Sequence, residues 1–155
     1  MASKDPRESR VLQVPAAEPQ EAESYFLHRL SVETDPSDVH ADLTKGVVGF
    51  VVVDCRPVAD YAAGHIPGAV NLPYASLSQD STASLSTDAT YVIYDAGLFD
   101  NACTKSALRM ATLGFRVKEM MGGLAGWRAE GHPVAIGTAA GKVATASKAT
   151  LARVK

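Results

Sequence analysis

The stretch that decides the fold runs from Val51 to Pro73 and reads VVVDCRPVADYAAGHIPGAVNLP. It opens within an apolar run, residues 47–53, which is far shorter than the roughly 20 residues that span a bilayer and is typical of a buried strand, here expected over 47–54. A short helix is expected over 57–63 and a turn over 64–68, where glycines flank a proline of fixed φ. An extended piece over 69–72 follows. This order of elements is typical of parallel sheets.

The same alternation continues downstream. A second apolar strand is expected over 90–94, followed after a loop by a helix near 101–113. A strand over 115–120 and a last helix around Trp127 complete the pattern. We therefore predict an α/β fold with a central parallel β-sheet flanked by helices on both faces.

Two helices are predicted ahead of this region. The first begins near Glu18 and is amphipathic to about Leu30. The second begins at Asp35, an N-cap residue followed by a proline, and ends at Gly46. The strand predicted over 47–54 is expected to begin directly after that glycine.

The ends of the chain differ from its centre in composition. Residues 1–17 mix charges and prolines without a period and are predicted to be a flexible lead-in, and 18–136 to be one domain. Residues 137–155 contain four Lys or Arg and no acidic residue, a local charge of 4 − 0 = +4. We expect a disordered basic tail there, capable at most of a weak contact with an anionic partner.

Composition narrows the classes of function. The formal charge is 15 − 17 = −2, which favours neither nucleic acid nor a membrane surface. The two cysteines are too few for a disulfide framework, and no Cys/His cluster has zinc spacing, so no metal and no cofactor are expected. The first thirty residues lack the apolar core of a secretory signal. The expected location is the cytoplasm.

Two segments of the chain carry a family resemblance. The first is DCR at 54–56 with GHIPGAVNLP at 64–73, and the second combines LGF at 113–115, GG at 122–123, Trp127 and GHP at 131–133. Together they resemble the rhodanese family. That resemblance implies a sulfurtransferase in which a cysteine directly after the strand at 90–94 holds sulfur as a persulfide. The following loop and helix N-terminus would form a cradle for anions.

Asp95 stands where the resemblance implies the catalytic cysteine. A carboxylate cannot form a persulfide and would itself accept the N–H groups of the cradle. We therefore expect little or no sulfurtransferase activity. Asp100 adds a second negative charge that disfavours an anionic donor, or serves as the cap of the helix that follows, as Asn101 would. The expected binding loop comprises Ala96, Gly97, Leu98, Phe99, Asp100 and Asn101.

Three polar residues of the first segment are expected to be structural. Asp54 and Arg56, at the end of a strand, are placed to tie loops together by charge-assisted hydrogen bonds, although contact with the site is an alternative. His65, in the turn, is expected to be a hydrogen-bonded structural histidine rather than a base.

Cysteines elsewhere leave an enzymatic alternative open. Cys103 falls in the first turn of the helix after the loop, where the helix dipole lowers a thiol pKa, so it is a candidate displaced nucleophile. It also belongs to a stripe of small residues typical of close packing, in which thiols are inert. Cys55 is expected to fill core volume. A weaker alternative makes Asp95 itself a nucleophile or base.

The leading hypothesis is a non-catalytic binding or regulatory module with a degenerate sulfurtransferase site. Its partner would be a protein or a small anion near the Asp95 loop. Leu98 and Phe99 would be exposed at the loop tip unless the fold covers them, and exposed apolar patches mark contact sites.

Overall fold

The computed structural model describes residues 5–144 and divides the chain into two compact units, with the boundary between Ser31 and Val32. The first unit contains the short 3-10 helix η1 (Pro6–Glu8) and helix α1 (Pro19–Val32), whose last residue lies past the boundary. Ala22 and Arg29 are half-buried in α1 and its other residues are exposed. The apolar face predicted for this helix is therefore solvent-facing, with Tyr25 and Phe26 packed edge to face.

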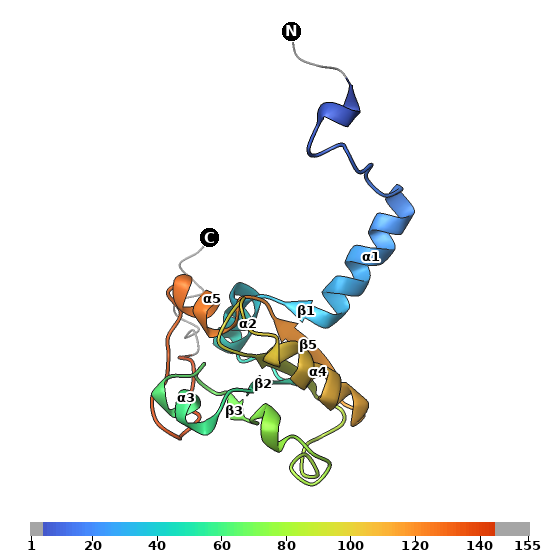
Figure 1. The fold of residues 1–155 in the computed structure, drawn as a ribbon. Helices are drawn as coiled ribbons and strands as arrows, with labels where there is room; N and C mark the ends of the chain where they lie inside the picture. Colours follow the sequence, from blue (N-terminus) through green and yellow to red (C-terminus); the bar gives the residue numbers. More distant parts are fainter. Residues whose placement is uncertain (1–4, 145–155) are drawn as a thin grey trace. The chain divides into compact units, whose positions relative to one another are not determined.

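The second unit is a three-layer α/β structure around a five-stranded parallel sheet of order β1-β5-β4-β2-β3 (Figure 1). This confirms the predicted fold class. The strands are β1 (Glu33–Thr34), β2 (Phe50–Asp54), β3 (Val70–Asn71), β4 (Thr90–Tyr94) and β5 (Arg116–Met120). The helices are α2 (Pro36–Lys45), α3 (Val58–Ala63), η2 (Tyr74–Ser76), α4 (Ala102–Thr112) and α5 (Gly123–Ala129).

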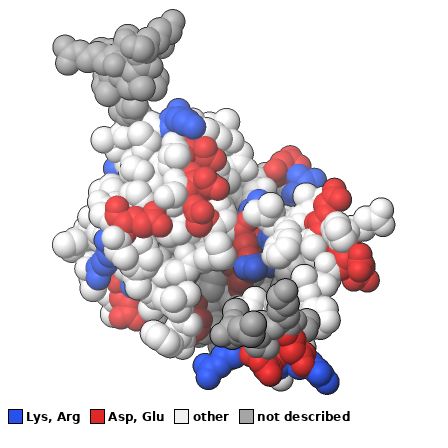
Figure 2. Space-filling view, turned by 90° about the horizontal axis from the view of Figure 1, so that it is seen from above, with Lys and Arg blue, Asp and Glu red and all other residues white. Residues whose placement is uncertain are grey.

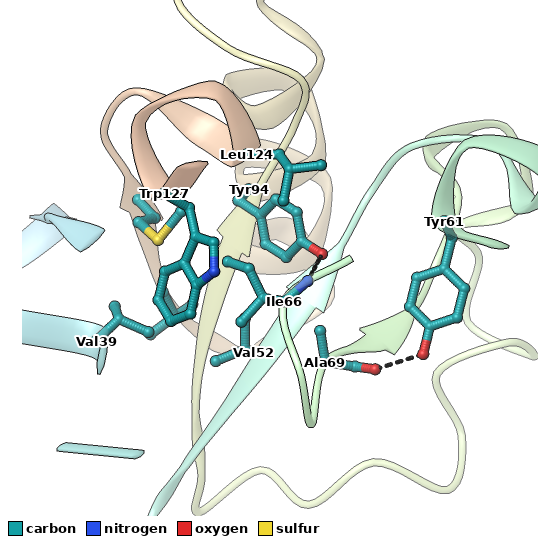
Figure 3. Packing of buried hydrophobic residues seen from close by; sticks show 10 residues of the cluster. Val39, Val52, Tyr61, Ile66, Ala69, Tyr94, Leu124 and Trp127 are labelled. Carbon is teal, nitrogen blue, oxygen red and sulfur yellow. Dashed lines mark hydrogen bonds between the residues drawn. The ribbon is translucent and has the colours of Figure 1, made fainter. Parts of the chain in front are cut away.

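Side chains of successive strand residues serve opposite faces of the sheet. Val52 and Val92 point into one cluster, with residues of α2, α3 and α5, and Trp127 is fully buried at its centre (Figure 3). Val53 and Ile93 point into the other, which packs against α4. Because both faces are covered, the strands are apolar on both sides, which is what the sequence pattern indicated.

Helix α2 follows its sequence signals closely. The Asp35 carboxylate accepts the N–H of Asp38 at 2.8 Å, and Gly46 ends the helix with φ of 70°. The strand that follows was predicted from Val47 but begins at Phe50. The N–H of Val47 is held by the carbonyl of Asp42 in the helix C-cap, which excludes it from the ladder. The two-residue strand β1 was not predicted.

The segment from Ala135 to Gly141 runs along the turn that follows α3. His65 and Ala135 exchange backbone hydrogen bonds, and the carbonyl of Ala140 accepts from the N–H of Gly68 at 2.6 Å. The first residues of the expected tail are thus hydrogen-bonded within the second unit and are not a free tail, whereas positions 145–155 lie outside the described residues. Within residues 5–144, no helix is long and apolar enough to cross a membrane.

Candidate functional site

The candidate site lies at the carboxyl ends of β2 and β4, where Asp54 pairs in register with Tyr94. Asp95 follows Tyr94 directly and is 4% exposed. Its carboxylate accepts the backbone N–H of Gly97 at 3.1 Å and that of Cys103, in the first turn of α4, at 3.0 Å. Two N–H groups of the predicted cradle are therefore occupied by a side chain of the same chain, as the sequence indicated.

Opposing effects act on the ionisation of Asp95. Burial, the largest effect, raises the pKa of its carboxyl, while the N–H groups of Cys103 and Gly97 lower that pKa. The negative charge of Asp100 raises the pKa further. Burial and the two N–H groups therefore act in opposite directions on this carboxyl group.

Gly123 makes the close packing around Asp95 possible. It lies at the start of α5 with φ of 56°, and a Cβ atom there would stand 2.6 Å from the carbonyl oxygen of Asp95 and 2.7 Å from the nitrogen of Gly97. The N–H of Leu124 then donates to that same Asp95 carbonyl at 2.9 Å. The GG pair at 122–123 was predicted only as a turn, and this close approach required the tertiary structure.

Asp100 has the capping role considered for it. Its carboxylate accepts the N–H of Ala102 at 2.8 Å and remains exposed to solvent. Asn101 occupies the N-cap position of α4 by its backbone and makes no side-chain capping bond. The negative charge of Asp100 is thus held at the surface beside the loop.

Neither cysteine has the surroundings of a nucleophile. Cys103 is 7% exposed, its thiol donates to the carbonyl of Ile93 at 3.1 Å, and burial raises its pKa above the ordinary thiol value. Burial likewise raises the pKa of Cys55 to about 12. The enzymatic alternative depends on a lowered pKa for the Cys103 thiol, whereas burial raises that pKa.

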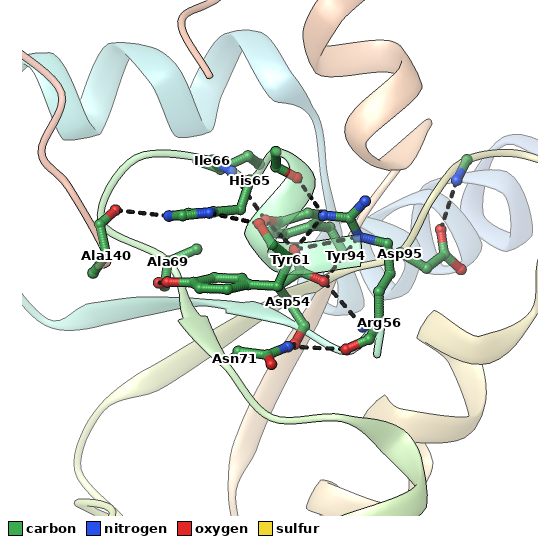
Figure 4. Close-up of polar contacts among 12 residues, drawn as sticks. Asp54, Arg56, Tyr61, His65, Ile66, Ala69, Asn71, Tyr94, Asp95 and Ala140 are labelled. Carbon is green, nitrogen blue, oxygen red and sulfur yellow. Dashed lines mark hydrogen bonds and ion pairs between the residues drawn. The ribbon is translucent and has the colours of Figure 1, made fainter. Parts of the chain in front are cut away.

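Asp54 and Arg56 form a buried brace beside the site (Figure 4). The Arg56 guanidinium donates to both carboxylate oxygens of Asp54, with the shortest contact at 2.6 Å, and to the carbonyl of Gly64 at 2.6 Å. The hydroxyl of Tyr94 donates to the same Asp54 carboxylate at 2.6 Å and accepts the N–H of Ile66. The brace therefore ties β2, β4 and the turn after α3 together, and its charges are satisfied internally.

His65 is fully buried within that turn. One ring nitrogen lies 2.9 Å from the carbonyl of Tyr61 and the other 3.1 Å from the carbonyl of Ala140. The ring also stacks on Tyr61 with centroids 3.7 Å apart. These contacts are structural, and they hold the 135–141 segment against the turn.

The loop tip is apolar and exposed. Leu98 is 81% and Phe99 106% exposed. Between the loop and α5 lies a cavity of about 510 Å³, whose far wall consists of Gly122, Ala125, Gly126 and Ala129. Of these small residues the sequence pointed only to Gly122, as part of a turn, although their spacing of three and four positions is that of one helix face.

A second cavity, of about 490 Å³, lies on the other side of the loop. Its wall combines Cys55, Arg56 and Asp60 with Tyr74 of η2. Ala96 and Asp100 border both cavities. Within the described part of the chain, no group of three or more His, Cys, Asp or Glu side chains is arranged to hold a metal ion.

The chain is similar to a known protein family and to individual proteins. Residues 35–130 match the model of the rhodanese-like domain. Over 91 residues the chain is 41% identical to the HTH-type transcriptional regulator Rv0324 of Mycobacterium tuberculosis. That match covers 58% of this chain and 39% of the regulator, so the chain corresponds to well under half of that protein.

Solved structures share the architecture. The BH2092 protein of Bacillus halodurans is 36% identical with a TM-score of 0.76, and the match covers 87% of this chain and 98% of that one. The rhodanese-like domain of the Anabaena Alr3790 protein is 29% identical with a TM-score of 0.62, over 75% and 87% of the two chains. The thiosulfate sulfurtransferase of Pseudomonas aeruginosa, 21% identical with a TM-score of 0.60 over 77% and 23%, shares the fold alone.

Proposed function

Because the chain belongs to the rhodanese-like domain family, we propose that it is a non-catalytic binding module whose sulfurtransferase site is degenerate. The observation that carries this proposal is the position of the Asp95 carboxylate, which accepts the N–H groups of Gly97 and Cys103. Those groups belong to the loop and helix that would cradle an anionic sulfur donor, and here a resident anion holds them.

The chemistry of sulfur transfer supports the same conclusion. A persulfide forms on a thiolate, and a carboxylate offers no sulfur atom to extend. A donor such as thiosulfate would also approach the negative charges of Asp95 and Asp100 without a free guanidinium to balance them, since Arg56 is bound by Asp54. Both the nucleophile and the donor site are therefore compromised.

The displaced-nucleophile alternative finds little support in the geometry. For Cys103 to attack a donor, its thiol would have to leave the carbonyl of Ile93 and reach solvent from a buried helix face. Such a rearrangement breaks the hydrogen bond of the thiol and moves a buried side chain before any chemistry begins.

A regulatory role is supported by the similarity to a transcriptional regulator. The matched segment is a minor part of that protein, which is the arrangement expected of a module that serves another function rather than of a free-standing metabolic enzyme. We propose that this chain acts through a partner protein bound near the Asp95 loop.

The test is sulfur transfer from thiosulfate to cyanide by the purified, reduced chain. We expect no turnover by the wild type and slow but measurable turnover by Asp95→Cys, because the variant supplies a thiol while Asp100 still disfavours an anionic donor. Cys103→Ala in each background is the matched control. Turnover by the wild type would contradict the proposal. The displaced nucleophile would be established instead if the active wild type carried a persulfide adduct of about 32 Da on Cys103 and if Cys103→Ala abolished the turnover.

A further inference from the structure

The loop 96–100 separates two cavities of similar size. We call the surface formed by this loop and both cavities the loop face. The α5-side cavity is almost entirely apolar, because small residues of α5 and the tip of the loop form its walls. The α3-side cavity carries charge and an aromatic ring. Asp100 borders both, so a ligand that crosses the loop would meet an apolar site, a carboxylate and then a polar site.

The exposed tip favours a protein segment over a small molecule. Leu98 and Phe99 line the α5-side cavity and are 81% and 106% exposed, so a compound that filled this cavity would contact them from the cavity side only. A polypeptide lying across the loop would cover both side chains and fill the cavity at the same time. Burial of apolar area and of an aromatic anchor is the main source of affinity in such contacts.

Charge identifies the kind of segment. The charged residues that line the two cavities are Arg56, Asp60 and Asp100. Arg56 is already bound by Asp54 and the Gly64 carbonyl, which leaves two carboxylates as the charges that face a ligand. Arg109 lies outside the lining, over the ring of Tyr74. On the face drawn in Figure 2, acidic and basic side chains both lie among white residues of other types.

The same charges disfavour a second copy of this chain as the occupant. In a two-fold contact whose axis passes through the loop, Asp100 would approach the Asp100 of the other copy. Like charges placed opposite one another in a partly buried contact are unfavourable. A cationic partner removes this cost.

We propose that the loop face binds a segment of another protein in which apolar side chains are followed closely by Lys or Arg. The apolar side chains would occupy the cavity between the loop and α5, and the cation would lie between Asp100 and Asp60. This inference rests on the proposed binding function and specifies the chemistry of its partner.

Model peptides test the proposal on the full chain by ¹H–¹⁵N correlation spectra. The probe acetyl-GSLLFKKSG-amide is compared with acetyl-GSLLFEESG-amide, which reverses the charge, and acetyl-GSGSGKKSG-amide, which removes the apolar side chains. We expect the first to cause saturable shifts at Gly97, Ala125 and Gly126 at about 1 mM or below, and the other two to bind about tenfold more weakly or worse.

Variants with matched controls locate the contact. Phe99→Ser should weaken the first peptide by about tenfold, because it removes the aromatic anchor, whereas Leu108→Ser, at another exposed apolar site, should not. Asp100→Asn retains an oxygen for the N–H of Ala102 and should cost about two- to fivefold. Asp88→Asn is its control. Because Phe99 is exposed, its variant should melt like the wild type.

Three results would overturn this inference: equal binding of the charge-reversed peptide, shifts confined to another surface, or no binding of the first peptide at about 5 mM. That concentration is roughly five times the largest dissociation constant expected. Shifts of the loop-face signals on dilution without peptide would overturn it in favour of a second copy. In each case a wild type that is silent in the sulfur-transfer assay leaves the proposed function standing, whereas turnover in that assay defeats the proposed function itself.

Discussion

Two segments meet at the carboxyl end of the sheet and differ in how they are held. The turn after α3 is fixed by the Asp54–Arg56 brace, by Tyr94 and by both ring nitrogens of His65. The loop after β4 is anchored at its base by Asp95 and at its far end by Asp100, while Leu98 and Phe99 between them stand in solvent.

The comparison explains how a family fold can persist while its site changes. The polar groups of the turn are buried and satisfied by one another, so each replacement would leave a partner unpaired. The side chains at the loop tip pack against nothing in the core, and their replacement changes the surface without disturbing the sheet. Stability and site chemistry are thus carried by adjacent but separate segments.

The largest effect is expected from Asp54→Ala. The variant leaves the Arg56 guanidinium and the Tyr94 hydroxyl buried without their shared acceptor, and we expect a loss of about 3–5 kcal/mol in the free energy of unfolding. Urea denaturation measures it. The matched control is Asp60→Ala, which removes an exposed carboxylate in the first turn of α3 and should change stability by about 0.5 kcal/mol or less. Similar losses for the two variants would show that the brace contributes little.

A smaller effect is expected from Gly123→Ala. The new Cβ would clash with backbone atoms of Asp95 and Gly97 and would sit at positive φ, so we expect a loss of about 2–3 kcal/mol. Gly131→Ala serves as the control, because Gly131 also has a positive φ, 75°, but has open space around it. We expect it to lose about 1–2 kcal/mol in the free energy of unfolding. Thermal unfolding and the amide signal of Gly97 would report both. Equal losses would mean that the loop moves away from α5 without cost.

The smallest effect concerns pH. Since the pKa of Asp95 is raised by burial, its contribution to stability is fully present below the unfolded-state pKa and is lost as pH rises through the folded-state pKa. The wild type should therefore lose stability relative to Asp95→Asn between acidic and neutral pH. Urea denaturation of both proteins at about pH 3 and pH 7, on either side of that window, measures the change. A difference of the opposite sign would show that the two N–H bonds outweigh burial.

Local signals in the sequence were sufficient where the interactions that form an element are themselves local. Asp35, the proline after it and Gly46 define α2 because a capping bond and a left-handed glycine act within a few residues. The start of β2 was misplaced because Val47 and Val48 are apolar in sequence but are 46% and 89% exposed after the helix cap. Apolar character alone does not report which backbone groups are already bonded.

The sequence by itself determined the alternating order of strands and helices, the carboxylate at position 95 and the positions of the two cysteines at 55 and 103, since these follow from residue type and short-range pattern. Only the tertiary structure decided that Cys103 is buried under the sheet, that α5 approaches Asp95 through Gly123 and that the loop divides two cavities. Those features depend on residues far apart in the chain that packing brings into contact, and burial, which governs both thiol reactivity and carboxylate pKa here, is a property of that packing.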